Sequence, residues 1–253
     1  MLAVERRQAI LDALYREKRL YVAALSQRFD VTEETIRKDL EKLEKQGFLS
    51  RVYGGAVINR HQQEEVPYMD RETINRDLKR IIASQAVALI EPGDRLMIDS
   101  TTTCHELLDM THAISDLTLI TNSARLAYQS AGLSHSVVTL GGELRKRSMS
   151  YCGSFTEDNA RHFNADIFFF SCRGLDMARG VTEATLPESR VKQAMMQQSE
   201  RTVLLVDHTK FDSVTFVNLC ALEALDTVIT DRAPPDRWLR VLQEKGVKVL
   251  YPV

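Results

Sequence analysis

Apolar side chains recur at helical spacing in three consecutive segments at the start of the chain. These segments are residues 3–16, 22–29 and 32–46. The third turns Ile36, Leu40 and Leu43 to one side. Thr32 suits its N-cap, because a threonine hydroxyl accepts a free backbone N–H of the first turn, and Gly47 suits its C-terminal end. The pattern predicts three helices, the third with a polar outward face.

Two short β-like runs follow, residues 48–52 and 56–58, separated by two glycines. Paired glycines between such runs are typical of a hairpin turn. Three helices followed by a hairpin is the order of a winged helix-turn-helix. The sequence therefore predicts a DNA-binding domain over residues 1–58, followed by a polar linker over residues 59–72.

The rest of the chain, residues 73–253, alternates between helix-like and strand-like segments. Helices are expected at residues 73–90, 103–110, 123–131, 155–163, 187–198 and 235–245. Strands are expected at residues 95–99, 117–121, 136–140, 166–171, 202–207, 227–230 and 247–251. This alternation predicts right-handed βαβ units, and so an α/β domain with a mostly parallel sheet covered by helices on both faces.

The composition supports a folded cytoplasmic protein. Of 253 residues, 44% are hydrophobic and 27% are charged, which is ordinary for a globular chain. No run approaches the roughly 18 apolar residues of a membrane span, and the N-terminus does not resemble a signal peptide. The four cysteines lie far apart without a C-x-x-C pair, so we expect buried reduced thiols and neither a metal site nor a cofactor.

The charge distribution favours a DNA contact confined to the first domain. Residues 1–60 carry 12 Lys and Arg against 9 Asp and Glu, a net charge of +3, whereas the remainder carries −5. On the third helix, short polar and basic side chains face outward in the first turns, where base edges would lie. With the N-cap and two hairpin residues, the predicted contacts to double-stranded DNA are Thr32, Glu34, Thr35, Arg37, Lys38, Arg51 and Tyr53. An amphipathic helix with charges on its solvated face is the alternative.

A pattern of specific residues at fixed spacing extends well beyond that helix. The chain reads Thr35-Ile36-Arg37-Lys38-Asp39-Leu40-x2-Leu43-x3-Gly47-x-Leu49-x-Arg51-x-Tyr53-Gly54-Gly55, with Arg6-x3-Ile10-x3-Leu14 upstream. This pattern resembles the DNA-binding signature of the DeoR family of bacterial regulators, and the resemblance continues over nearly the whole chain. The family usually has histidine where Tyr53 stands, which leaves the contact of the hairpin with DNA open.

The resemblance has implications for the second domain. Sensor domains of the family look like the ribose-5-phosphate isomerase and coenzyme A transferase folds and usually bind sugar phosphates as inducers. Lys192 matches the family's lysine in E-x3-K, and Lys210 matches that in D-x-[ST]-K-F. The family usually has glycine where Thr101 and Ser171 stand, and no arginine at Arg173, so we hypothesise a different inducer, such as an acid or an acid phosphate.

The residues themselves indicate an anion site after one strand. Asp99, Ser100, Thr101, Thr102 and Thr103 follow the strand and open a helix, where hydroxyls and free N–H groups gather, although such clusters also serve as plain helix caps. Other candidates end strands at the same edge of the sheet. They are Asn122, Ser123, Gly141, Gly142, Arg173, Asp176, Glu183, Lys192 and Lys210.

These features predict a DNA-binding repressor of a carbohydrate or sugar-acid catabolic operon that a small phosphorylated metabolite releases from its operator. A single DNA-binding domain offers a small interface, so a homodimer or homotetramer is expected. Two alternatives stay open: a transcriptional activator, and a sugar-phosphate isomerase or transferase with an appended DNA-binding module. Asp99, Asp176, Glu183 and Lys192 could act as acid and base in the latter, but no nucleophile motif appears.

Overall fold

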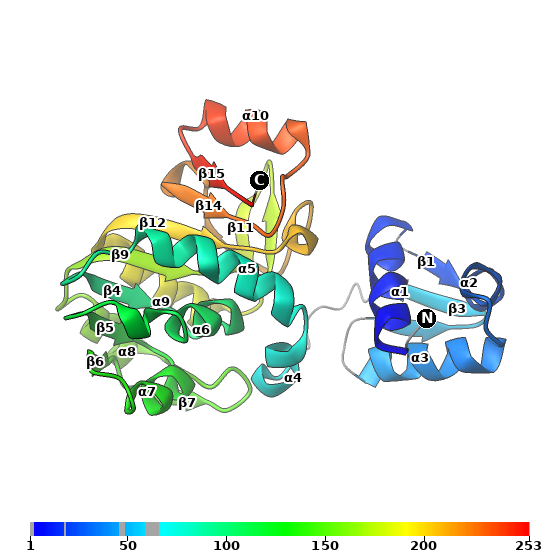
Figure 1. Ribbon diagram of the computed structural model, residues 1–253, viewed down its shortest axis with the longest axis horizontal. Helices are drawn as coiled ribbons and strands as arrows, with labels where there is room; N and C mark the ends of the chain where they lie inside the picture. The colour runs from blue at the N-terminus through cyan, green and yellow to red at the C-terminus, as the bar shows by residue number, and fades with distance from the viewer. Residues whose placement is uncertain (1–2, 18, 46–48, 59–65, 253) are drawn as a thin grey trace. The chain divides into compact units, whose positions relative to one another are not determined.

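The computed structural model describes residues 3–17, 19–45, 49–58 and 66–252. The chain divides into two compact units, residues 1–66 and 67–253, called here the head and the sensor unit (Figure 1). Each has its own hydrophobic core. The predicted helix end at Gly47, the strand start at Phe48 and residues 59–65 of the predicted linker lie outside the described residues.

The head contains three helices and a small antiparallel sheet of order β1-β3-β2. The helices are α1 (Ala3–Glu17), α2 (Val22–Phe29) and α3 (Glu33–Lys45), and the strands are β1 (Arg19–Tyr21), β2 (Leu49–Val52) and β3 (Gly55–Ile58). Ile36, Leu40 and Leu43 are buried in the core, as the periodicity predicts. Strand β1 was not predicted, because three residues are too few to show an alternating pattern and the strand depends on its pairing with β3.

The sensor unit is built on a seven-stranded sheet of order β15-β14-β12-β9-β4-β5-β6 in which every pairing is parallel, which confirms the predicted α/β class. The strands are β4 (Arg95–Ile98), β5 (Thr118–Thr121), β6 (Ser136–Thr139), β9 (Ala165–Phe170), β12 (Ser199–Leu205), β14 (Thr227–Ile229) and β15 (Lys248–Leu250). The helices between and around them are α5 (Arg76–Ala86), α6 (Thr102–Leu108), α7 (Ala124–Ser130), α8 (Ser154–Ala160), α9 (Leu186–Gln197) and α10 (Asp236–Glu244).

Strand β9 shows why the sheet needs helices on both faces. Phe168 and Phe170 lie stacked on one face, with ring centroids 4.9 Å apart, in a core that includes Trp238 of α10. Phe169 points to the opposite face and packs in a second core with Ile82 of α5. Successive side chains of a strand alternate between faces, so an uninterrupted apolar run requires an apolar cover on each side.

The structure differs from the prediction where the chain enters the sensor unit. The helix predicted over residues 73–90 is divided into α4 (Tyr68–Thr73), α5 and the 3-10 helix η1 (Val87–Leu89). The break lies at Asn75, whose φ of 52° is left-handed and cannot continue a right-handed helix. Helix α4 therefore occupies residues 68–72 of the predicted linker, and Tyr68 is buried.

Further unpredicted elements follow the carboxyl ends of the central strands. Strands β7 (Glu143–Arg145) and β8 (Ser150–Cys152) form a hairpin. Strands β10 (Gly174–Asp176), β11 (Gly180–Glu183) and β13 (Val217–Cys220) form a second antiparallel sheet. Short 3-10 turns η2 (Thr111–Ala113), η3 (His208–Lys210) and η4 (Leu222–Ala224) complete the loops. None of the helices described is long and apolar enough to cross a membrane.

Candidate functional site

The first turn of α3 presents the predicted DNA-contact side chains on the surface of the head. Thr32 caps the helix, since its Oγ1 accepts a hydrogen bond from the Thr35 backbone N–H at 3.2 Å. Glu34, Arg37 and Lys38 are exposed, while Ile36 between them is fully buried. The outward face therefore carries residue types that contact base edges and phosphates, while the opposite face of the helix packs in the core of the head.

Two of the predicted arginines are already paired with carboxylates. Arg37 Nη2 lies 2.5 Å from Glu33 one turn earlier on α3. Arg51 of β2 lies 2.6 Å from Glu44 of α3 and also donates its backbone N–H to that carboxylate at 2.8 Å. Although partial burial alone would raise the pKa of the Glu44 carboxyl, the hydrogen bonds from Arg51 lower it. Arg51 thereby joins the hairpin to α3, and fully exposed Tyr53 stands at the turn.

Asp39 fixes the angle of α3 against α1. Its carboxylate is buried and lies 2.6 Å from Arg6 Nε and 3.3 Å from Arg7 Nη1, both of α1. In the sequence, Arg6 and Asp39 stand out only as positions of the DNA-binding signature. Their spacing along the chain gave no sign of the contact, because it joins residues 33 positions apart.

Four of the predicted effector residues lie together around one buried ammonium, that of Lys192: Asp99, Arg173, Glu183 and Lys192. Lys192 Nζ lies 2.5 Å from Glu183, 3.1 Å from Asp99 and 2.7 Å from the carbonyl oxygen of Ser171. Although burial alone would lower the pKa of Lys192, the carboxylates of Glu183 and Asp99 raise it. Burial would likewise raise the pKa of Glu183, but Lys192 and then Arg173, whose Nε lies 3.7 Å away, lower it. These opposite shifts keep Glu183 and Lys192 as an ion pair.

The Ser/Thr turn after β4 is organised by Asp99. The carboxylate accepts hydrogen bonds from the backbone N–H of Thr101 at 2.8 Å and from its hydroxyl at 2.5 Å. Thr101 in turn caps the seven-residue helix α6. Ser100, Thr102 and Thr103 are buried beside it. Part of the cluster therefore has the capping role that the sequence analysis left as an alternative, and the buried hydroxyls remain candidates for a ligand.

The remaining candidates divide into those at this edge and those with another visible role. Ser123 caps α7, and the neighbouring Asn122 is buried, with its Oδ1 lacking a hydrogen-bond partner among the described residues. Gly142 has a φ of 115°, and a Cβ there would lie 2.0 Å from Thr156 Oγ1, so the close approach it allows is to α8; Gly141 also has a positive φ of 62°. Asp176 accepts hydrogen bonds from the backbone N–H groups of the β10–β11 turn.

One residue that the sequence analysis did not select is Lys79. It lies on α5, is 5% exposed, and donates to the carbonyl oxygen of Arg71 at 2.5 Å. Burial and then the positive charge of Lys210 lower its pKa to about 7. Helical periodicity could not reveal it, since a lysine on a helix is ordinarily solvated and the burial of this one depends on tertiary packing.

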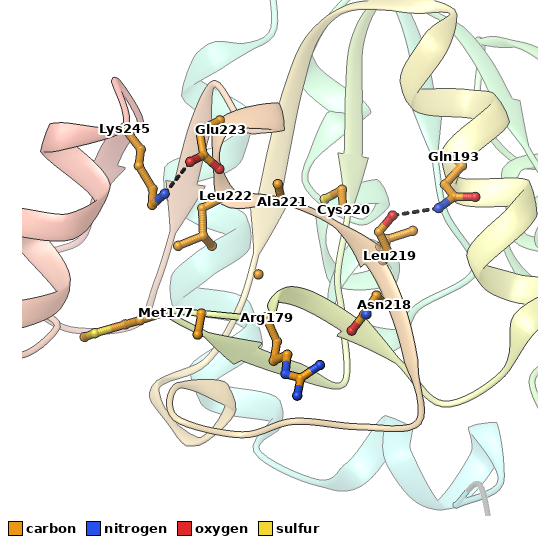
Figure 2. A pocket seen from close by; sticks show the side chains of 12 residues that line it. Met177, Arg179, Gln193, Asn218, Leu219, Cys220, Ala221, Leu222, Glu223 and Lys245 are labelled. Atoms are coloured by element: carbon orange, nitrogen blue, oxygen red, sulfur yellow. Dashed lines mark hydrogen bonds and ion pairs between the residues drawn. The ribbon is translucent and has the colours of Figure 1, made fainter.

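A separate pocket of about 510 Å³ opens between the second sheet of the sensor unit and helices α9 and α10. Figure 2 shows Arg179, Gln193 and Asn218 around it, with Lys245 paired to Glu223 at its rim. None of the predicted effector residues lines it. Within the described part of the chain, no three His, Cys, Asp or Glu side chains are grouped as metal ligands.

Comparison with known proteins assigns the chain to a family. Residues 6–62 match the model of the DeoR-like helix-turn-helix domain, and residues 74–232 match that of the DeoR C-terminal sensor domain. The HTH-type transcriptional regulator YulB of Bacillus subtilis is 34% identical over 98% of this chain and 96% of its own length. The putative aga operon transcriptional repressor of Escherichia coli O157:H7 is 32% identical over 97% and 93%.

The chain is also similar to a further regulator and, in fold, to a solved isomerase structure. The glycerol-3-phosphate regulon repressor of Escherichia coli K12 is 29% identical over 98% of this chain and 99% of its own. Ribose 5-phosphate isomerase A of Methanocaldococcus jannaschii aligns with a TM-score of 0.41 and 16% identity over 54% of this chain and 55% of that structure, and no function follows from it. The chain belongs to the DeoR family and is a DNA-binding transcriptional regulator rather than an enzyme.

Proposed function

We propose that the protein is a cytoplasmic repressor that binds operator DNA through α3 and the β2–β3 hairpin and is released by a phosphorylated metabolite bound at the carboxyl edge of the sensor sheet. It acts as a homodimer or homotetramer, so that two heads read repeated half-sites. The names of two relatives, the repressors of the glycerol-3-phosphate regulon and the aga operon, support a sugar or sugar-acid pathway.

The observation that carries the effector proposal is the density of buried polar groups at this edge. Nine side chains from different elements there are less than 10% exposed: Asp99, Ser100, Thr102, Thr103, Asn122, Ser123, Ser171, Glu183 and Lys192. Burying polar groups costs free energy, and most folds avoid it away from functional sites. The partnerless Asn122 Oδ1 is an acceptor that a sugar hydroxyl could satisfy.

The proposed function is tested with intergenic DNA that lies upstream of the genes next to the gene for this protein. Fluorescence anisotropy of the full-length protein on labelled intergenic duplexes is expected to show nanomolar, sequence-selective binding, of the order of 10⁻⁸ M or tighter. Adding phosphorylated sugars and sugar acids one at a time is expected to weaken binding about 5- to 150-fold for the effector. No selective binding to any of these duplexes would contradict the assignment of the head.

Repression rather than activation is tested in cells. A reporter driven by the bound promoter is expected to rise when the gene for the protein is deleted and to fall on its return. A reporter that falls on deletion would make the protein an activator, since the sign depends on where the operator lies.

Lys38→Ala and Arg37→Ala are each expected to weaken operator binding by 1–3 kcal/mol, about 5- to 150-fold, because each removes a cation from the outward face of α3. Arg37 first has to exchange Glu33 for DNA, so the loss at Lys38 is expected to be the larger. Anisotropy at several salt concentrations measures both, and each lost phosphate contact lowers the salt slope by about 0.9. Lys248→Ala, at an exposed strand end of the sensor unit, is the charge-matched control. Unchanged affinity in both head variants would refute the proposed contact.

Arg173→Ala tests the chemistry of the effector. We propose that its guanidinium, which is mostly buried beside Glu183, recognises a carboxylate or phosphate of the ligand. Calorimetry with the effector found in the release assay is expected to show at least a tenfold weaker Kd, in line with the 1.5–3 kcal/mol of a charged hydrogen bond. Wild-type affinity in the variant would remove Arg173 from the site and, with it, the argument for an acidic ligand.

A further inference from the structure

Helix α4 is the first helix of the sensor unit, and contacts with α6, α7 and the β7–β8 hairpin help to hold it (Figure 1). The backbone N–H of Tyr68 donates to the carbonyl oxygen of Arg147, in the turn of the hairpin, at 2.7 Å. The Glu72 carboxylate lies 3.5 Å from Nη2 of Arg125 on α7 and 3.9 Å from Nε2 of His105 on α6. The chain therefore enters the sensor unit through a short helix whose position depends on three other elements.

Two of these elements begin at candidate effector residues. Helix α6 starts in the Ser/Thr turn, where the backbone N–H of His105 donates to the carbonyl oxygen of Thr101 and the Thr101 hydroxyl donates to Asp99. Helix α7 starts after its cap Ser123, and Arg125 lies in its first turn. Each of the two side chains that face α4 is thus within one helical turn of a residue proposed to contact the effector.

The β7–β8 hairpin is bound to the start of α7 by backbone hydrogen bonds. The backbone N–H of Tyr151 donates to the carbonyl oxygen of Asn122 at 2.7 Å, and Asn122 Nδ2 donates to the carbonyl oxygen of Tyr151 at 3.2 Å. The N–H of Ala124 donates to the carbonyl oxygen of Met149 at 2.9 Å. A displacement of Asn122 is therefore carried to the hairpin turn that accepts the hydrogen bond from Tyr68.

The contacts around Glu72 are long for an ion pair, since charged N–H···O bonds usually measure about 2.7–2.9 Å. Burial lowers the pKa of His105 below its ordinary value, so its imidazole is uncharged at neutral pH and Arg125 is the cation opposite Glu72. The Tyr68 hydroxyl, His105 Nδ1 and Arg125 Nε are buried without a hydrogen-bond partner in the described part of the chain. Because unsatisfied polar groups raise the free energy of this arrangement, a small shift of α6 or α7 is enough to change how α4 is held.

We propose that Glu72 is a coupling residue, through which occupation of the effector site changes the hold on α4 and, through α4, the DNA affinity of the head. The effector acts on the first turns of α6 and α7, and the single carboxylate of Glu72 faces a side chain from each. Since the chain enters the sensor unit at α4, the change acts on the covalent connection to the head. The inference rests on the proposed function, because it supplies a route from the same effector site to the same DNA-binding domain.

The quantity to measure is the coupling ratio, the factor by which a saturating effector weakens operator binding. Wild type is expected to show a ratio of about 5 to 150. Glu72→Gln keeps the size of the side chain and removes its charge, and it is expected to lower the ratio below about 3. Asp70→Asn is the matched control, because Asp70 is an exposed carboxylate on the same helix, and it should keep the wild-type ratio.

The ratio is measured on the full-length protein by fluorescence anisotropy on its operator, with ribose 5-phosphate and glycerol 3-phosphate as probes. Calorimetry of the same probe, with and without the operator duplex, should return the same ratio, because coupling between two binding sites is reciprocal. A residue with a purely structural role would shift the individual Kd values and leave their ratio unchanged. Arg125→Gln, and the double variant with Glu72→Gln, should show the same low ratio, since all three remove one contact.

Hydrogen exchange follows α4 directly. In wild type, the probe that releases the operator is expected to change the exchange rate of backbone amides in residues 67–74 at least fivefold. In Glu72→Gln the same probe should leave that rate unchanged. Since the Glu72 side chain is partly exposed, the variant is expected to fold, and its melting temperature verifies this.

The outcomes separate this inference from the function on which it rests. If Glu72→Gln or Arg125→Gln keeps the wild-type ratio, or if the probe leaves exchange over residues 67–74 unchanged in wild type, the coupling role is refuted and the proposed function stands. If neither probe alters the operator affinity of wild type, the phosphorylated effector and the coupling role both fall.

Discussion

Replacing Lys192 by methionine is expected to lower the free energy of unfolding of the sensor unit by about 3–5 kcal/mol. The ammonium stands between the buried carboxylates of Glu183 and Asp99, and removing it leaves Arg173, 3.7 Å from Glu183, as the remaining cation beside two buried negative charges. Urea denaturation followed by circular dichroism measures the loss. Lys248→Met, which removes an exposed lysine, is expected to change it by less than about 0.5 kcal/mol.

The pH dependence gives this prediction a second readout. The pKa of Glu183 is lowered and that of Lys192 is raised, so in wild type their contribution is complete between the ordinary values of 4.5 and 10.5. Without Lys192, burial favours the protonated form of the Glu183 carboxyl in the folded state. The variant should therefore recover stability as the pH falls from 8 to 5. A loss independent of pH, or none, would contradict the ionised network.

Asp39→Ala is expected to abolish operator binding while leaving the sensor unit folded. Removing this carboxylate leaves the mostly buried Arg6 guanidinium without its ion pair and breaks the link between α3 and α1. The expected loss in the free energy of unfolding of the head is about 3–5 kcal/mol. A unit of about 60 residues has little more stability than that to lose. Calorimetric melting should show the head transition lowered or absent and the sensor transition unchanged.

Glu33→Ala supplies the control on the same helix. Glu33 is exposed and pairs with Arg37 one turn along α3, so its loss should change head stability by less than about 0.5 kcal/mol. If Asp39→Ala melts like this control and binds DNA like wild type, the Asp39 network does not hold the head together.

How far the fold could be predicted depended on the range of the interactions. The strand run Ile167 to Phe170 and the helix face of Ile36, Leu40 and Leu43 were predictable because local periodicity records which side is buried. The short strands of the second sheet were not, since a strand such as β11 depends on its partner β13, more than 30 residues away. Nor did residues 73–90 signal the left-handed Asn75, because asparagine is also acceptable within a helix.

The candidate site followed the same division. The sequence analysis expected Asp99, Glu183 and Lys192 at one edge of the sheet, and the structure brings them together: Asp99 follows β4, Glu183 ends β11 of the second sheet and Lys192 lies within α9. It could not show that Asp176 caps a turn or that Gly142 adjoins Thr156, since each depends on backbone conformation. Lys79 was missed for another reason: its type and position in the sequence are ordinary for a helix, and its burial depends on tertiary packing.

The carboxylates on α3 also bear on how such a head would search a genome. In the proposed complex, Glu33 and Glu44 hold Arg37 and Arg51 until phosphates replace them, and so act as built-in competitors. The phosphates of any duplex, whatever its sequence, have to displace these carboxylates from the arginines. Only an operator adds contacts to base edges. Random DNA is then bound more briefly, which leaves more of the protein free to sample other positions.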